Sequence, residues 1–193
     1  MATQDQSVEL VDANVIRPFA RAALLAALTG ALAYVSIPIP FSLAPISLGI
    51  VGIFLAGLFL GPRWGTVSVL LYLAAGAAGA PIFANGNAGL GYLFGQTGGF
   101  LWSYPIAAFV IGATVHGLGD LRNPADAPIP VLVGGLVAGT LVVYTGGVLW
   151  FMWLLEIGPL EAIAIGVAPF VVGEILKIAA TVAIAKSGVV DPT

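Results

Sequence analysis

The chain has 193 residues, of which 60% are hydrophobic and only 8% are charged, and its mean hydropathy is +1.08. A soluble domain typically carries about 25% charged residues, so this composition excludes a water-soluble protein and indicates a polytopic membrane protein in a lipid bilayer. The formal charge of −3 is too small to indicate a partner, and no basic tract suggests nucleic-acid binding. Cysteine is absent, which excludes disulfides and thiolate metal ligands.

Six apolar segments approach the length of about 20 residues that a membrane-spanning helix needs. Proline ends several of them, because it cannot continue a helix. An interfacial segment up to Ala168 is expected before the last span, since Pro169 divides that apolar stretch. The sequence thus predicts an all-α, six-helix transmembrane domain over residues 17–188, after a flexible cytoplasmic tail over residues 1–16. The predicted spans are residues 18–37, 45–60, 64–80, 97–118, 130–153 and 169–185.

The basic residues fix the predicted topology. All but one fall at chain ends or links on one side of the membrane: Arg17, Arg21, Arg63, Arg122 and Lys186. By the positive-inside rule this side is cytoplasmic. We therefore expect a multi-pass protein of the cell membrane with both termini in the cytoplasm. Lys177 is the one basic residue that this topology does not place on the cytoplasmic side.

The last span carries two charges, Glu174 and Lys177, near its middle. A charge at the bilayer centre costs about 2.5–3.5 kcal/mol even on insertion scales. Residues three apart share one helix face and can touch, so the pair must point into the helix bundle. A structural ion pair is one interpretation. We favour a ligand-binding site, because apolar side chains would usually serve stability as well or better.

The glycine-rich loop over residues 82–96 is the second candidate for ligand binding. Its apolar side chains favour a loop that folds back into the bundle, which is tolerated at membrane depth only where it lines a cavity or is buried. The alternative is an ordinary exposed loop. Thr97 is expected to cap the following helix, where free N–H groups favour an anion. The candidate ligand-binding residues of this region are Asn85, Asn87, Tyr92, Gln96, Thr97, Gly98 and Gly99.

The first span has two stripes of small residues at every fourth position. One stripe is Ala22, Ala26 and Gly30, and the other is Ala23, Ala27 and Ala31. Such stripes make flat surfaces for another helix; packing within the bundle and docking of a partner both fit the spacing, and packing is the safer interpretation.

Catalytic and cofactor motifs are missing from the sequence. His116 is expected at the membrane interface rather than at a metal, because no second histidine and no cysteine accompany it. Ala185 stands before Lys186-Ser187 where a phosphate-binding loop needs glycine. No nucleophile–base pair is visible either. We expect no metal, no cofactor and no enzymatic activity, and any uphill transport must draw its energy from a partner or an ion gradient.

Several motifs together resemble the BioY family, the biotin-binding S components of energy-coupling factor (ECF) transporters. They cover Tyr34–Phe41, Phe54–Gly65, Leu70–Pro81, Gly95–Phe100 and Pro169–Lys177. The chain departs from the family pattern at three positions, where the family usually has Asp, Pro and Tyr: Glu174, Gln96 and Phe100.

The resemblance implies a six-helix S-component fold with a pocket near the outer leaflet, closed by the loops after the first and third helices. It also implies a transmembrane coupling subunit, EcfT, and two ABC ATPases as partners, with EcfT docking on an alanine stripe of the first helix. Biotin's ureido N–H groups would bind Glu174. Lys177 would bind the ureido carbonyl or the carboxylate, and Asn85, Asn87 and Tyr92 are candidates for the remaining polar atoms.

Two alternatives remain open from the sequence. The first is an S component for another vitamin. The second is a stand-alone channel or proton-coupled carrier that uses Glu174 and Lys177 as a relay.

Overall fold

The structure is a computed structural model that describes residues 13–40 and 42–191, with side chains from Val15 onward. The prediction of an all-α protein is confirmed, since only two short strands occur in the described residues, β1 (Ser36–Ile37) and β2 (Ile46–Ser47), which pair antiparallel. Two 3-10 turns, η1 and η2, cover Ala84–Gly86 and Ala168–Phe170. The helices are α1 (Ala13–Tyr34), α2 (Gly49–Ala77), α3 (Leu90–Leu93), α4 (Gly98–His116), α5 (Ile129–Leu155), α6 (Pro159–Gly166) and α7 (Val171–Lys186).

The predicted N-terminal tail, residues 1–16, falls mostly outside the described residues. The described part begins with α1 at Ala13, four residues before the predicted domain boundary at residue 17. The apolar span within this helix runs from Val15 to Tyr34.

Five helical segments of the described chain are long and apolar enough to cross a membrane, whereas the sequence predicted six. The difference lies in α2, which joins predicted spans 45–60 and 64–80 across a bend at Gly61, where φ is 71°. The first arm, residues 49–60, is about 18 Å long at 1.5 Å per residue, which is short of the ~30 Å hydrocarbon core. The two arms meet at Gly61, where the backbone is not helical, so they correspond to the two predicted spans, and the predicted six-helix fold is broadly consistent with the structure.

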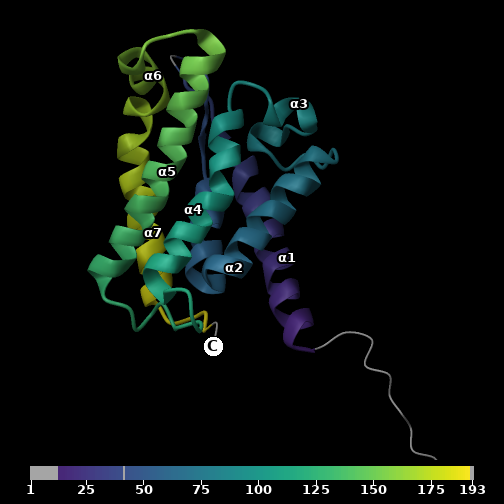
Figure 1. Cartoon of the computed structure of the whole chain (residues 1–193), viewed down its shortest axis with the longest axis vertical. Helices are drawn as coiled ribbons and strands as arrows, with labels where there is room; N and C mark the ends of the chain where they lie inside the picture. The colour runs from purple at the N-terminus through teal and green to yellow at the C-terminus, as the bar shows by residue number, and fades with distance from the viewer. Residues whose placement is uncertain (1–12, 41, 192–193) are drawn as a thin grey trace, which may run out of the picture.

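The helices are arranged around α2 and α4, with α1 on one side and α5 to α7 on the other (Figure 1). The first arm of α2 is buried on every side, as expected for a helix that is apolar all round. Glycines let the helices approach closely: Gly52 lies against Thr29 of α1, and Gly112 of α4 lies against Pro62. The start of α1, the end of α7 and the 117–128 link share one end of the molecule (Figure 1).

This end, which carries Arg21, Arg63 and Arg122, is called the arginine-bearing end below. The opposite end holds α3, α6 and the strand pair (Figure 1). At the arginine-bearing end, the link 117–128 is bound to the end of α7, since Lys186 Nζ donates to the carbonyl oxygens of Ala125 (2.7 Å) and Ala127 (2.6 Å).

The bend in α2 is stabilised by His116, which lies at the end of α4 and is buried among protein side chains (1% exposed). In a regular α-helix the carbonyl of Leu58 would accept the N–H of residue 62, but Pro62 has none. His116 Nε2 donates to that carbonyl at 2.8 Å, and Nδ1 accepts the backbone N–H of Arg122 at 3.1 Å. The imidazole thus replaces the missing helical hydrogen bond and holds the link 117–128 against the bend.

Replacing His116 by alanine is expected to destabilise the protein by about 1–3 kcal/mol, because the buried Leu58 carbonyl loses its donor. Thermal unfolding of the purified protein in detergent measures this. Thr114→Val is the matched control, since that exposed hydroxyl bonds only within its own helix, to Val110. Equal melting temperatures for His116→Ala and the control would contradict the role of the imidazole.

Candidate ligand-binding site

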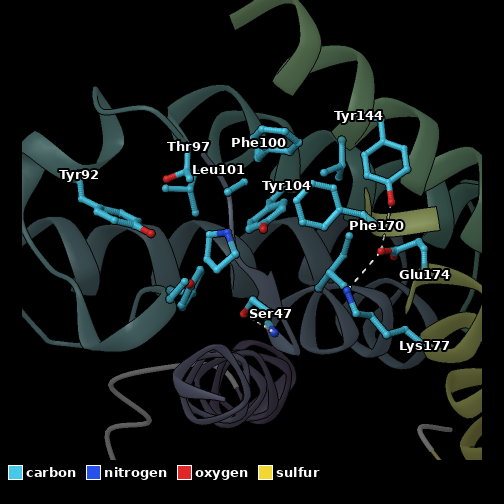
Figure 2. A pocket seen from close by; sticks show the side chains of 17 residues that line it. Ser47, Tyr92, Thr97, Phe100, Leu101, Tyr104, Tyr144, Phe170, Glu174 and Lys177 are labelled. Atoms are coloured by element: carbon cyan, nitrogen blue, oxygen red, sulfur yellow. Dashed lines mark hydrogen bonds and ion pairs between the residues drawn. The ribbon is translucent and has the colours of Figure 1, made fainter. Parts of the chain in front are cut away.

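A cavity lies inside the bundle towards the end opposite the arginines. Both arms of α2 reach it, as do α4, α5 and α7, and the segments around β2 and η1 cover it. The residues that line it are Ala44, Pro45, Ser47, Gly49, Ile50, Tyr72, Ala84, Tyr92, Thr97, Phe100, Leu101, Tyr104, Val143, Tyr144, Phe170, Glu174 and Lys177. Figure 2 shows polar groups at both ends and aromatic or aliphatic side chains between them. Such a cavity suits a small ligand with an apolar body and polar ends.

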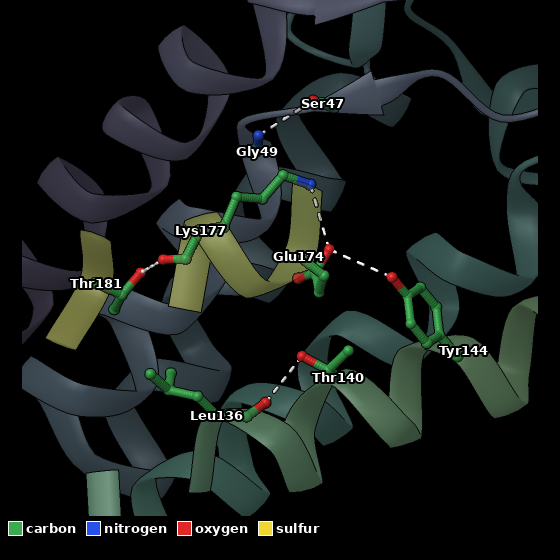
Figure 3. A network of polar contacts seen from close by, with 8 residues as sticks. All are labelled: Ser47, Gly49, Leu136, Thr140, Tyr144, Glu174, Lys177 and Thr181. Atoms are coloured by element: carbon green, nitrogen blue, oxygen red, sulfur yellow. Dashed lines mark hydrogen bonds and ion pairs between the residues drawn. The ribbon is translucent and has the colours of Figure 1, made fainter. Parts of the chain in front are cut away.

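Glu174 and Lys177 form the acid–base end of this cavity. Both belong to α7 and are buried, with 5% and 8% of their surface exposed. Lys177 Nζ donates to Glu174 Oε2 at 3.3 Å, and the Tyr144 hydroxyl of α5 donates to the same oxygen at 3.4 Å (Figure 3). One carboxylate oxygen therefore takes both contacts.

The other oxygen, Glu174 Oε1, is buried and has no hydrogen-bond partner within the described chain. Leaving a buried acceptor unpaired costs about 1–3 kcal/mol, and more for a charged group, so such atoms are rare in folded proteins. The ion pair satisfies only half of this carboxylate. The free oxygen is an acceptor that suits a donor on a bound molecule.

Tyrosines supply further polar groups along the cavity. Tyr104 of α4 lies between the acid–base end and the end formed by Tyr92 and Thr97 (Figure 2), and Tyr72 of α2 also lines the cavity. The Tyr72 side chain is 2% exposed and packs edge-on against Phe83, with ring centroids 5.5 Å apart. Phe83 in turn stacks on Tyr92 at 5.2 Å. The covering loop is therefore anchored to the cavity wall by a row of aromatic rings.

The structure divides the predicted ligand-binding residues into three groups. Glu174, Lys177, Tyr92 and Thr97 line the cavity. A more open recess beside it shares Pro45, Tyr92 and Thr97 and holds three predicted residues, all exposed: Asn85, Asn87 and Gln96.

Gly98 and Gly99 line neither space. A Cβ at either position would clash with Trp150 of α5, so these glycines allow α4 and α5 to pack closely. Thr97 directly precedes α4, but its side chain makes no capping hydrogen bond. Thr97 therefore lines the cavity and does not cap the helix through its side chain.

The sequence analysis missed several lining residues: Ser47, Tyr72, Tyr104, Tyr144 and Phe170. A usable signal existed for the tyrosines. Tyrosine in membrane helices is enriched at the interfaces, whereas Tyr72 and Tyr144 lie near the middle of their predicted spans. A buried hydroxyl at such a depth requires a partner or a cavity.

The two alanine stripes of α1 differ in burial. Ala22 is fully buried, Ala26 is 8% exposed, and Gly30 is also buried. The Ser68 hydroxyl of α2 donates to the Ala22 carbonyl at 2.8 Å, so this stripe packs within the bundle. The other stripe, Ala23, Ala27 and Ala31, is exposed. Only the second stripe presents a surface to another protein.

A multi-pass helical bundle with an internal amphipathic cavity is the architecture of a membrane protein that binds a small solute. Across residues 13–40 and 42–191, no cluster of three or more His, Asp or Glu side chains is placed to hold a metal ion.

The chain matches the BioY family over residues 3–190. A probable biotin transporter BioY from Pyrococcus horikoshii is 37% identical over 165 residues, covering 85% of this chain and 91% of that protein. The biotin transporter BioY of Rhodobacter capsulatus is 37% identical over 175 residues, covering 85% and 88%.

The fold resembles a crystal structure of the S component for biotin from an ECF-type ABC transporter. The TM-score is 0.78 at 27% sequence identity, and the match covers 92% of this chain and 93% of that one. The chain belongs to the BioY family. It therefore has the S-component fold and is a transport component of the membrane rather than an enzyme, as the sequence resemblance implied.

Replacing Lys177 alone by methionine is expected to destabilise the fold by about 3–5 kcal/mol, because Glu174 keeps its buried charge without a cation. The double variant Glu174→Leu/Lys177→Met is expected to be at least as stable as the wild type, since it buries no charge. Thermal unfolding in detergent compares them. A double variant less stable than Lys177→Met would show that the pair serves the fold, against a ligand-binding role.

Proposed function

We propose that this protein is the substrate-capture subunit of an ECF-type importer and that it binds biotin in the cavity beside Glu174 and Lys177. The unpaired, buried Oε1 of Glu174 carries the proposal, because it offers a charged acceptor that nothing in the described chain uses. The named biotin transporters among its relatives support this ligand.

The chemistry of biotin complements the cavity. Its ureido ring has two N–H donors and one carbonyl acceptor, which match the Glu174 carboxylate and the Lys177 ammonium. The fused rings and the aliphatic tail fit the apolar middle, where Phe100, Leu101 and Phe170 lie (Figure 2). The carboxylate of the tail would then reach the Tyr92 and Thr97 end, where hydroxyl donors are present and no carboxylate lines the wall.

The cavity opens to the outside in this proposal. It lies towards the end opposite the arginines, and the positive-inside rule assigns the arginine-bearing end to the cytoplasm. The segments 42–48 and 84–97 cover the cavity and would admit biotin from the exterior. Asn85, Asn87 and Gln96 line the recess next to it and would meet the ligand at entry rather than in its final position.

Uptake would be driven by partner subunits. We assign docking of the transmembrane coupling subunit EcfT to the exposed stripe Ala23, Ala27 and Ala31, because the parallel stripe is buried within the bundle. Two ABC ATPases bound to that coupling subunit would supply the energy. Both termini would lie in the cytoplasm of a cell-membrane protein.

The proposal predicts saturable binding of radiolabelled biotin to the purified protein. Glu174→Gln is expected to weaken binding at least tenfold, because a hydrogen bond to a charged group contributes about 1.5–3 kcal/mol. Thr140→Val is the matched control, since this buried hydroxyl donates to Leu136 of its own helix and lies outside the cavity lining (Figure 3).

Unlabelled biotin should displace the radioligand, and thiamine or riboflavin should not. Displacement by either of those would assign the cavity to another vitamin. No saturable biotin binding by a monodisperse preparation would exclude the proposed function.

The docking assignment predicts that Ala27→Trp abolishes co-purification with the coupling subunit while biotin binding persists. Ala26→Trp is expected to prevent folding, because Ala26 is only 8% exposed and packs inside the bundle. Leu141→Trp, on an exposed position of α5 (60% exposed), is the control and should leave association unchanged. Normal association of Ala27→Trp would remove this stripe from the interface.

A further inference from the structure

The cavity proposed to bind biotin adjoins the open recess at the end remote from Glu174 and Lys177. The two spaces share three lining residues, Pro45, Tyr92 and Thr97. Tyr92 and Thr97 lie at the opposite end of the cavity from the charged pair (Figure 2). A ligand whose ureido ring contacts Glu174 would therefore direct its tail towards the recess.

The charges around this tail are few. Among the described residues that line the cavity, Lys177 is the one cation, and it lies at the ureido end. The described residues that line the recess are all uncharged. The tail carboxylate of biotin would thus meet hydroxyl and amide groups but no cation. A neutral group in place of this carboxylate would forfeit no ion pair, so the lining at this end does not select for the free acid.

Side-chain amides give the recess hydrogen-bonding groups that suit a peptide-like ligand. Asn85, Asn87 and Gln96 line it and are exposed. Asn87 Nδ2 donates to the carbonyl oxygen of Ala84 at 2.7 Å, which holds that side chain against the loop. Each side-chain amide carries both donors and an acceptor. Together they can pair with the N–H, C=O and carboxylate groups of an amino acid.

The recess also has room for a larger substituent. Gly91 of α3 lines it and is exposed. A Cβ added at Gly91 would meet nothing within 4 Å. The space beyond the end of the biotin tail is therefore open rather than closed by a wall.

We propose, building on the proposed biotin site, that the protein also binds biotin amides in which the tail carboxylate is joined to an amino acid, with Nε-biotinyl-lysine as the leading case. The amide carbonyl would accept a hydrogen bond from the hydroxyl of Tyr92 or Thr97. The amino-acid part would lie in the recess among its side-chain amides. Biotin serves enzymes as a group carrier, attached to lysine as an amide. Proteolysis of such proteins is the class of reaction that would supply this ligand.

Competition with radiolabelled biotin on the purified protein tests the proposal. Nε-biotinyl-lysine, freed of biotin by chromatography, is expected to displace biotin with an affinity within about tenfold of that of biotin, because neutral hydrogen bonds replace those of a carboxylate. An amide that fails to compete where unlabelled biotin does would overturn the proposal and leave the biotin site standing. The absence of any biotin binding would instead exclude the proposed function, and the amide site with it.

Gly91→Phe tests where the amino-acid part lies. The added ring would occupy the recess, so this variant is expected to bind the amide at least about tenfold more weakly, while its equilibrium affinity for biotin stays within about threefold of the wild type. Gly134→Phe is the matched control and should change neither affinity. Gly134 is also an exposed helical glycine with nothing within 4 Å of an added Cβ, and it lines neither space.

Retained biotin binding by Gly91→Phe shows that the variant is folded. Equal weakening of both ligands in a monodisperse preparation, or weakening of neither, would place the amino-acid part outside the recess and overturn the proposal.

Discussion

The constraint on which the structure depends is the burial of one carboxylate and one ammonium group among membrane helices. Glu174 and Lys177 are almost fully buried, and their contact joins only one carboxylate oxygen to the amine. Apolar side chains at both positions would avoid the cost of removing two charges from water. The cavity next to the pair explains why the charges are kept, because it leaves the second oxygen available to a ligand.

The bend in α2 shapes this cavity. Gly49 and Ile50 of the first arm and Tyr72 of the second arm all line it, which a straight helix of this length would not allow. The positive φ of Gly61 makes the bend, and His116 supplies the hydrogen bond that Pro62 removes. The buried His116 thus helps to hold the bent helix that lines the cavity.

The sequence predicted the apolar segments and the burial of the charged pair in the bundle, because hydropathy and the cost of intramembrane charge act locally along the chain. It placed the break at Gly61-Pro62, but it did not predict that His116 of α4 donates a hydrogen bond to Leu58 there, since this depends on a contact between helices that are distant in the sequence. Choosing between the two alanine stripes also required tertiary contacts. Gly98 and Gly99 were assigned to an anion site, but their closeness to Trp150 of α5 shows a packing role that spacing alone does not reveal.

The most direct test of the central claim is an experimental structure of the protein with biotin bound. The account predicts biotin in the cavity between α2, α4, α5 and α7, with a ureido N–H within hydrogen-bond distance of Glu174 Oε1. Biotin bound elsewhere, or an Oε1 that stays unpaired in the complex, would contradict the claim that the buried pair is kept for the ligand.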